Sequence, residues 1–415
     1  MRVGVLSHWF DPEGGAAAGP GTISRAIHQR GHEVDVLTGY PIYPEGKVFE
    51  GYSIRPYQKE TIRGVTVHRV PIYPSHDDNA ARRMANYLSY AGASSIAAPA
   101  ILRNSDVALV YSSPATAATA AVPLKLLRGI PFVVQIQDLW PDTVTSSGFV
   151  ADSTGSVMDR VLNYYCDAVY RHAAHIAVIS PGMANLLIDR GVPADKVSVL
   201  PNWAEESSFY PTAKDPALAT AFGIDRDFTV MYAGNHGEMQ NLDIVIEAAA
   251  QLRSRGDIGF ALVGAGVRKD ALRFRAAELR LDNIAFIDPQ PFGKMAQILA
   301  LGDAQLVSLK DVPLYRVTMP SKIQANMAAG RPIIAAVAGD AAEVVVESDC
   351  GVTARPGDVE DLVRATLSLA NASADRRADL SRNARAAYLR RFSEQSVGDS
   401  LVALLEAHRR PRRSK

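Results

Sequence analysis

The sequence predicts an α/β protein made of two doubly wound, Rossmann-like domains that face a cleft. The chain of 415 residues is too long for one folding core, and two domains of roughly 200 residues are the simplest division. Short apolar runs alternate with amphipathic segments in two successive series, which is typical of βαβ units and parallel sheets. A proline-bearing stretch over residues 201–216 interrupts the alternation and is interpreted as the linker between the series.

The first series predicts a sheet whose first strand covers residues 3–7. A glycine-rich loop follows this strand, and then come a helix over about residues 22–30 and a strand over 33–38. Further strands are expected at 65–70, 107–111, 131–136, 175–179 and 197–200, with a helix near 182–189.

The second series begins with a strand over residues 228–233. Further strands are expected at 258–263, 284–287, 304–308 and 333–337. Helices are expected near 242–254, 269–279, 295–301, 323–329, 359–369, 374–391 and 393–407. Ligands of such sheets bind beyond the carboxyl ends of the strands, so the cleft between the domains is the expected site.

The charge balance excludes a protein that grips nucleic acid through bulk positive charge. Forty-four basic residues match forty-four acidic ones, and 47% of the residues are hydrophobic, which also excludes a long disordered chain. The neutrality is a sum of parts, because residues 1–206 carry −2, residues 207–408 carry −3 and the last seven carry +5. Two separated cysteines and nine histidines without ligand spacing predict neither a disulfide framework nor a metal site.

Two segments bear on membranes. Residues 84–102 form the longest uncharged stretch, which is interpreted as one or two buried or half-buried helices. The alternative is a surface that rests on a membrane beside Arg82, Arg83 and Arg103. The basic tail 409–415 is either a solvated end or an added attraction to anionic lipid. The N-terminus lacks the pattern of a signal peptide, so a cytoplasmic location is expected, with peripheral contact to the membrane as the added alternative.

Glycines follow the first predicted strand. Gly14 and Gly15, with Gly19 and Gly21, precede the first helix, where backbone N–H groups and the helix N-terminus suit an anion. Plain turn chemistry is the alternative. The spacing is not GxGxxG, so a nicotinamide cofactor is not predicted.

A second loop carries carboxylates. Asp138 and Asp142 lie just after the strand ending at residue 136, with Trp140 between them, in a position suited to a ligand loop. In the alternative interpretation, Asp142 caps a helix and Trp140 packs beneath it.

Loops of the second series predict a diphosphate site. Asn235 and Gln240 follow the strand that ends at residue 233, and Gly264 follows the next strand. Ser321 and Lys322 open a helix, where a hydroxyl, an ammonium group and a helix N-terminus suit a diphosphate. The alternatives are tight turns, an N-cap serine and a surface lysine.

The order of these motifs resembles that of retaining glycosyltransferases of family 4, which have the two-domain GT-B fold. The resemblance covers nearly the whole chain and rests on seven segments taken together, and Pro320-Ser321-Lys322 is a signature of the subgroup that builds surface polysaccharides. The seven segments begin with the loop at 14–15 together with 30–34, and continue with 137–141, 179–183, 200–202, 232–235, 263–266 and 327–332.

The resemblance implies a glycosyl transfer from a nucleotide diphosphate sugar to a hydroxyl acceptor, soluble or lipid-linked, with retention at the anomeric carbon. It implies an acceptor-side domain over 1–202, a donor domain over 203–391, and a helix over 392–408 that returns to the first domain before the tail. Asp138 would orient the sugar or acceptor, and Asn235, Gln240 and Gly264 would line the donor pocket. The groups expected on the diphosphate are Gly14, Gly15, Ser321 and Lys322, without a cofactor or metal.

Several positions depart from the family pattern. The usual glutamate pair falls at Val317 and Ala325, the usual arginine and lysine fall at Asn235 and Gln240, and a frequent histidine falls at Gln137. The Pro-Ser-Lys subgroup shows similar changes, so the pattern does not imply an inactive enzyme. Arg316 and Arg268 are further candidates for the phosphate charge.

Two other functions remain open at this point. A sugar-nucleotide epimerase also uses two facing Rossmann-like domains, but it needs no acceptor and leaves the bond between nucleotide and sugar intact. A non-catalytic nucleotide-sugar-binding partner of another transferase would bind the donor without turnover. The donor base, the sugar, the acceptor, the linkage and the oligomeric state do not follow from the sequence.

Overall fold

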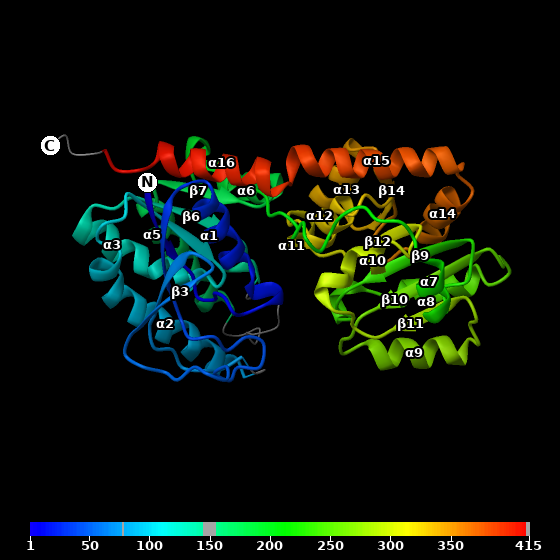
Figure 1. Cartoon of the computed structure of the whole chain (residues 1–415), viewed down its shortest axis with the longest axis horizontal. Helices are drawn as coiled ribbons and strands as arrows, with labels where there is room; N and C mark the ends of the chain where they lie inside the picture. The colour runs from blue at the N-terminus through cyan, green and yellow to red at the C-terminus, as the bar shows by residue number, and fades with distance from the viewer. Residues whose placement is uncertain (77–78, 144–154, 412–415) are drawn as a thin grey trace. The chain divides into compact units, whose positions relative to one another are not determined.

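The computed structural model describes residues 1–76, 79–143 and 155–411, which form two compact units (Figure 1). The first unit comprises Met1–Leu200 and Gly398–Lys415, and the second comprises Pro201–Val397. The division falls after Leu200, two residues before the boundary predicted from the sequence.

The first unit contains an eight-stranded sheet in the order β3-β4-β2-β1-β5-β6-β7-β8. Its strands are β1 (Arg2–Leu6), β2 (Glu33–Thr38), β3 (Gln58–Ile62), β4 (Val65–Arg69), β5 (Val107–Ser112), β6 (Phe132–Ile136), β7 (His175–Val178) and β8 (Val197–Val199). All neighbours pair in parallel except β3, which pairs antiparallel with β4 at one edge of the sheet. A turn through Arg63 and Gly64, both with positive φ, joins these two strands directly.

Helices surround this sheet. They are α1 (Gly19–Gln29), α2 (Ala80–Ile101), α3 (Ala121–Arg128), α5 (Gly155–His172) and α6 (Pro181–Asp189). The stretch 84–102 lies mostly within α2, a single half-buried helix, as expected, and one face of this helix is exposed. Every residue of the central strand β5 is buried, as a parallel sheet covered on both faces requires.

The second unit contains a six-stranded parallel sheet in the order β11-β10-β9-β12-β13-β14. Its strands are β9 (Phe228–Ala233), β10 (Ile258–Val263), β11 (Ile284–Ile287), β12 (Ala304–Ser308), β13 (Ile333–Ala336) and β14 (Gly351–Thr353). Its helices are α7 (Pro216–Ala221), α8 (Asp243–Gln251), α9 (Lys269–Glu278), α10 (Met295–Leu299), α11 (Pro313–Arg316), α12 (Ser321–Ala328), α13 (Asp340–Glu347), α14 (Val359–Ala370) and α15 (Ala374–Arg391).

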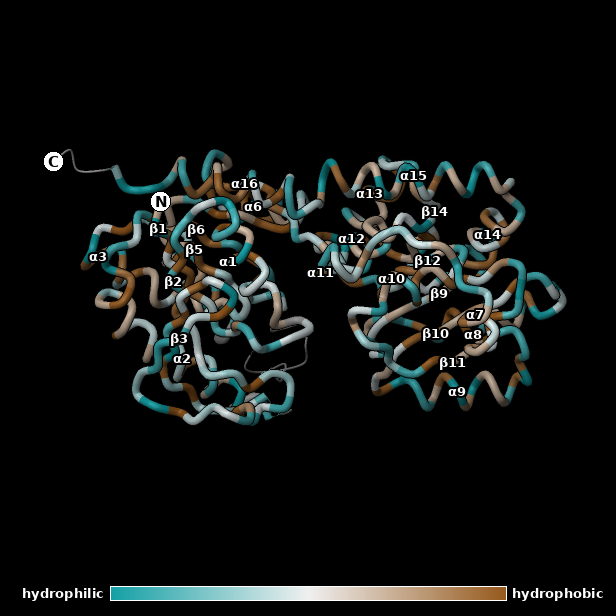
Figure 2. Tube along the Cα trace, viewed as in Figure 1, coloured by the Kyte–Doolittle hydropathy of each residue, from teal (hydrophilic) through white to brown (hydrophobic). Residues whose placement is uncertain are grey.

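Successive side chains of β9 enter opposite layers of the core. Val230 and Tyr232 pack with residues of α8, α9 and α14, whereas Met231 packs with residues of α10. This alternation follows from the two-residue period of a strand and places helices on both faces of the sheet. The strands are mainly hydrophobic and α15 mainly hydrophilic, as Figure 2 shows.

The last helix, α16 (Glu394–Ala407), begins in the second unit and ends in the first. In the first unit, the Arg30 side chain fills the space over Gly398 and donates a hydrogen bond of 2.7 Å to Asp399. The chain thus passes between the units twice, near residue 200 and near residue 397.

Candidate functional site

In the first unit, the glycine-rich loop lies at the point where the sheet changes direction. Strand β1 continues on one side to β2 and on the other to β5, and ligands of doubly wound sheets bind outside such a point. Gly14 is extended, and no atom lies within 4 Å of the position that a Cβ there would occupy. Gly15 has a φ of +63°, which favours glycine, and the nearest atom to its Cβ position is in the Tyr43 ring at 3.9 Å.

A buried carboxylate holds this loop in place. Glu13 accepts backbone N–H groups of Ile42 (2.7 Å) and Tyr43 (2.9 Å) at one oxygen and that of Phe10 (2.9 Å) at the other. Burial raises the pKa of Glu13, and the three hydrogen bonds oppose that shift. Glu13 was not predicted as a site residue, although an acidic residue directly before Gly14 is a signal that could have been followed.

Asp138 lies beyond the carboxyl end of β6, half-buried, and accepts a hydrogen bond of 2.7 Å from the Ser113 hydroxyl. Burial raises the pKa of Asp138, and the Ser113 hydrogen bond opposes this. Burial and the Asp138 charge together raise the pKa of the buried Tyr111. The Tyr111 hydroxyl occupies the space where a side chain at Gly19 would lie, so Asp138 and the start of α1 approach the same tyrosine.

The rest of the loop after β6 is structural. Trp140 is buried with Ala115, Leu162 and Cys166, as the alternative interpretation expected, but Asp142 is already helical and is therefore not the residue that caps a helix. Asp142 accepts a hydrogen bond of 2.7 Å from Arg190.

In the second unit, two glycine loops pack against each other at the ends of β9 and β10. The Gly234 N–H donates to the Val263 carbonyl (2.9 Å), and the His236 N–H donates to the Ala265 carbonyl (2.8 Å). Gly264 has a φ of +137°, and a Cβ there would overlap the Gly234 carbonyl. The sheet changes direction between β9 and β12, so this pair of loops also lies at a switch point.

Lys322 points into these loops. Its Nζ lies against Gly234 and 5.0 Å from the centre of the Tyr232 ring. Among the residues that the structure describes, no carboxylate pairs with this ammonium group. Burial lowers the pKa of Lys322, because no carboxylate among the described residues offsets the cost of burying its ammonium charge.

The histidine of the same loop was not predicted as a site residue. His236 is fully buried beneath the loop. Burial lowers its pKa, the Val263 backbone raises it, and the charges of Lys269 and Lys322 lower it further. A neutral imidazole therefore supports the loop without adding charge. The residues that shift its pKa, Val263, Lys269 and Lys322, lie far from it in the sequence, so no local pattern pointed to His236.

The other predicted residues of this unit differ in exposure and in hydrogen bonding. Asn235 is exposed, whereas the Gln240 side chain accepts the Gly237 N–H at 3.1 Å and closes a short 3-10 turn. Ser321 is exposed as the first residue of α12, and Pro320 is the N-cap, so the interpretation of Ser321 as a capping serine was wrong. Asn235, Gln240, Gly264, Ser321 and Lys322 belong to the second unit, and Gly14, Gly15 and Asp138 belong to the first.

The two arginine candidates already have partners. Arg268 contacts Asp243 (2.7 Å) and Glu238 (3.4 Å), and Arg316 makes two hydrogen bonds of 2.8 Å to Asp311. These carboxylates neutralise both guanidinium groups, which makes them weaker candidates for phosphate binding than Lys322.

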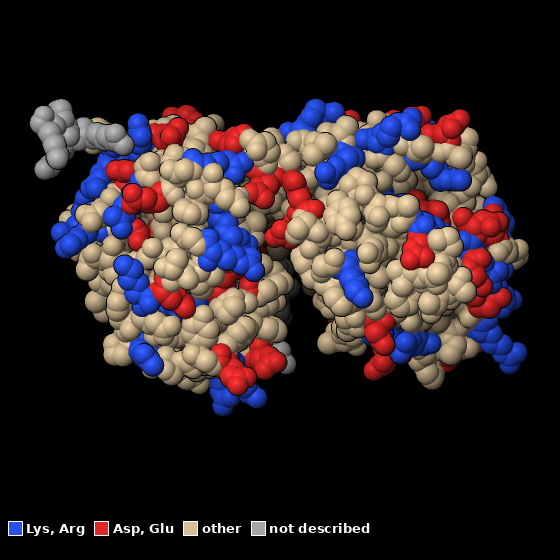
Figure 3. Space-filling model, in the orientation of Figure 1, with Lys and Arg blue, Asp and Glu red and all other residues tan. Residues whose placement is uncertain are grey.

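Metal-binding groups and membrane-spanning helices can be assessed over the described residues. Within 1–76, 79–143 and 155–411, no group of three or more His, Cys, Asp or Glu side chains is arranged to hold a metal ion. Over the same residues, no helix combines the length and apolar character needed to cross a membrane. On the face shown in Figure 3, acidic and basic side chains are interspersed.

Comparison with known proteins gives the family. Residues 14–203 match the model of a glycosyl transferase 4-like domain, and residues 227–372 match the model of glycosyl transferases group 1. The putative colanic acid biosynthesis glycosyl transferase WcaI of Escherichia coli (strain K12) is 30% identical over 335 residues, which are 80% of this chain and 82% of that protein.

Solved structures share the fold over nearly the full length. Sucrose-phosphate synthase from Thermosynechococcus elongatus has a TM-score of 0.72 at 16% identity, covering 98% of each chain. Anabaena HepE in complex with UDP and glucose has a TM-score of 0.69 at 17% identity, covering 98% of this chain and 100% of that one. The chain therefore belongs to the family 4-like glycosyltransferases with the GT-B fold, and it is a transferase enzyme of that type.

Proposed function

We propose that this enzyme transfers a glycosyl unit from a nucleotide diphosphate sugar to a hydroxyl acceptor, with retention of anomeric configuration, in the biosynthesis of a cell-surface polysaccharide or glycoconjugate. We further propose that it works in the cytoplasm, in peripheral contact with the membrane that carries a lipid-linked acceptor. The similarity to WcaI, named for colanic acid biosynthesis, supports the assignment to surface polysaccharides. HepE, which shares the fold, has been crystallised with UDP and with UDP-glucose, which supports a uridine nucleotide as the first donor to test.

The main observation that supports a donor diphosphate site in the second unit is the ammonium group of Lys322, which has no carboxylate partner among the described residues. An anion at the Gly234 loop would restore charge balance there, and a diphosphate fits the loop because backbone N–H groups and the first turn of α12 lie beside the lysine. Asn235, Gln240, Gly264 and Ser321 would line the same pocket. A metal ion or other cofactor has no part in this proposal.

In the proposed reaction, the bond between the anomeric carbon and the diphosphate oxygen breaks as the acceptor oxygen bonds to the same face of that carbon. The acceptor proton passes to the departing diphosphate. Lys322 stabilises the charge that develops on this leaving group, and the N–H groups of Gly14 and Gly15 are proposed to assist it. Asp138, held by Ser113, would accept a hydrogen bond from the sugar or acceptor and orient it.

Variants of Lys322 test the donor role. Lys322→Ala should weaken UDP-sugar binding by about 10- to 100-fold, since a hydrogen bond to a charged group contributes about 1.5–3 kcal/mol. Lys322→Arg keeps the charge and should retain part of the affinity, whereas Lys294→Ala changes an exposed lysine outside the site and should have no effect. Calorimetric titration with UDP-sugars measures each Kd, and an unchanged Kd in Lys322→Ala would contradict the assignment.

Product analysis tests the reaction itself. With the best donor and a panel of hydroxyl acceptors, NMR of the product should show a new glycosidic bond with the anomeric configuration of the donor. An inverted product would overturn retention. An altered sugar still attached to the nucleotide would indicate an epimerase, and donor binding without product across the panel would indicate a non-catalytic partner. Neither alternative is favoured by the family relationship.

A further inference from the structure

Helix α2 presents an apolar face to solvent. Its inner face is anchored, since buried Asn86 bonds to His8 at 2.8 Å and the Tyr90 hydroxyl donates to the Leu37 carbonyl at 2.8 Å. On the outer face, the exposed residues recur every three or four positions, and none between Arg82 and Arg103 is charged. They are Ala81, Ala85, Leu88, Gly92, Ile96 and Ala100. Leu88 is 57% exposed and Ile96 is 84% exposed.

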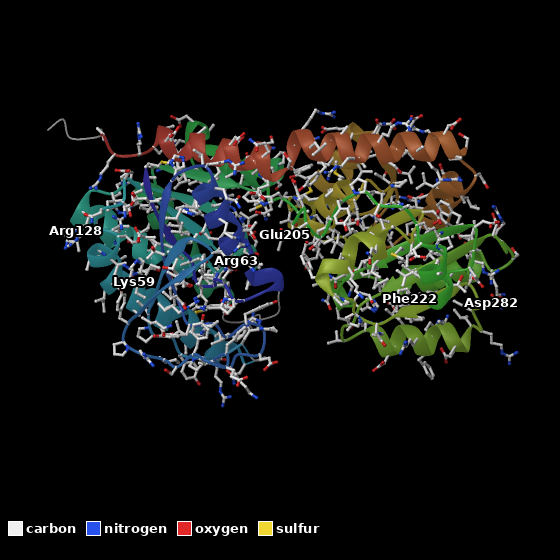
Figure 4. All side chains as sticks on the ribbon, in the orientation of Figure 1. Lys59, Arg63, Arg128, Glu205, Phe222 and Asp282 are labelled. Carbon is white, nitrogen blue, oxygen red and sulfur yellow. The ribbon has the colours of Figure 1, made fainter. Side chains whose placement is uncertain are left out.

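The end of α3 extends this face. Leu126 and Leu127 are consecutive and 67% and 69% exposed. The next residue, Arg128, donates a hydrogen bond of 2.7 Å to the Pro99 carbonyl, which sets the last turn of α3 beside the C-terminal half of α2. Figure 4 shows Arg128 at the outer edge of its unit.

The two helices that carry these apolar residues contain basic residues and no acidic ones. The sequences of α2, α3 and the intervening 3-10 helix (Ala115–Ala120) contain no Asp or Glu. Arg103 is exposed just after α2, and the Arg410 N–H donates to the Asp106 carbonyl (2.9 Å), which brings the start of the basic tail to the same loop. The Asp106 carboxylate is itself occupied by the Arg2 N–H at 2.7 Å. Asp77 and Asp78, before α2, lie outside the described residues.

We propose that these residues form a surface that docks on an anionic lipid bilayer, with α2 lying along the interface. We define the docking surface by the apolar Leu88, Ile96, Leu126 and Leu127 and the basic Arg103 and Arg128. Leucine and isoleucine side chains would enter the acyl boundary while the arginines pair with lipid phosphates. The inference rests on the membrane contact proposed above and names the surface that makes it.

A second copy of the chain is a poorer occupant of this surface. A two-fold symmetric dimer uses the same patch on both subunits, so Arg103 and Arg128 would face a partner patch whose helices carry no carboxylate. Opposite charge is available on a bilayer that contains phosphatidylglycerol. Charge complementarity therefore favours the membrane.

Vesicle flotation with the full chain tests the docking surface. The native protein should bind vesicles of equal parts phosphatidylglycerol and phosphatidylethanolamine and should not bind phosphatidylcholine vesicles. Leu126→Glu with Leu127→Glu should weaken binding by more than about tenfold, because the two leucines that would enter the bilayer are lost. Arg103→Gln with Arg128→Gln should weaken it by about fivefold for each arginine.

Matched controls separate the surface from general effects. Phe274→Glu changes a residue of α9 that is 68% exposed, and Lys59→Gln with Arg63→Gln removes two charges from exposed positions of the same unit (Figure 4). Both controls should bind vesicles like the native protein, and thermal unfolding should show every variant folded.

Three results would overturn the proposal: no binding of the native protein to anionic vesicles, equal losses in controls and test variants, or a dimer in solution that the leucine variants dissociate. Calorimetric titration of the same variants with UDP-sugars, without lipid, keeps this test separate from that of the proposed function. Loss of docking with intact donor binding concerns the surface alone.

Discussion

At the scale of single residues, the charge state of Lys322 decides how the donor site works. Burial lowers its pKa, and no carboxylate among the described residues offsets that shift. A buried lysine without a partner costs stability, and the anionic ligand proposed for the glycine loop would offset that cost. Arg268 and Arg316, which the sequence also offered, are neutralised by neighbours.

The lowered pKa of Lys322 predicts a pH dependence of donor binding. Because only the protonated amine attracts a diphosphate, UDP affinity should fall as pH rises towards and through this pKa, at a lower pH than for an ordinary lysine. Lys322→Arg keeps its proton over the same range, so its affinity should not show this fall. Calorimetric titration with UDP from about pH 7 to about pH 10 measures both. Parallel pH profiles for the two proteins would contradict the prediction.

At the scale of elements, the two glycine loops of the second unit depend on each other. The Gly234 carbonyl occupies the space above Gly264, and the loops exchange backbone hydrogen bonds along their length. The proposed donor pocket would therefore be built from main chain, with Lys322 supplying the charge.

The contact between the loops predicts the effect of a single methyl group. Gly264→Ala should destabilise the second unit by about 3 kcal/mol or more, since the new Cβ meets a carbonyl and the φ of +137° is strained for alanine. Gly293→Ala is the control, because no atom lies within 4 Å of its Cβ position, and it should change stability by less than about 1 kcal/mol. Thermal unfolding and soluble yield compare the two variants. Equal stability would mean that the loops can separate without cost.

At the scale of the whole molecule, one carboxylate links the segment that follows the first crossing between the units to the segment that precedes the second crossing. Glu206, just after the first passage, accepts the Tyr388 hydroxyl at 3.1 Å and the backbone N–H of Glu394 at 3.0 Å. Glu394 begins α16, so a negative charge at this position also suits the helix dipole. The linker and the returning helix are thereby held to the same unit.

Removing that carboxylate should loosen the second unit. Glu206→Ala removes the acceptor of the Glu394 N–H and one of the two acceptors of the Tyr388 hydroxyl, which also donates to the Ala204 carbonyl at 3.3 Å, and should cost about 1–3 kcal/mol, whereas Tyr388→Phe should cost about 1 kcal/mol. Glu205→Ala is the control, because this neighbouring side chain is exposed and accepts only the Ser207 hydroxyl at 3.0 Å (Figure 4). Urea unfolding measures the three free energies. A loss in Glu205→Ala equal to that in Glu206→Ala would remove the special role of Glu206.

Much of the fold could be predicted because the central strands are continuous apolar runs. Strands β9, β10, β11 and β12 have the predicted bounds, since each run ends at glycine or at a polar residue. The edge strand β3, with the sequence QKETI, was missed because its alternation is polar and its pairing with β4 supplies the structure. Strand β14 and helices α3, α5, α7, α11 and α13 were also missed, although the apolar residues of α3 and α5 recur on one helix face.

The sequence by itself determined two α/β series, glycine loops at strand ends, and a lysine in the first turn of a helix, because these depend on local pattern and chain topology. The tertiary structure decided which of the candidate charges are compensated, because ion pairs such as Arg268 with Asp243 join residues far apart in sequence. It also decided that Glu13 and His236 support the loops and that α2 exposes Leu88 and Ile96. Burial and pairing depend on position in space, which no local pattern specifies.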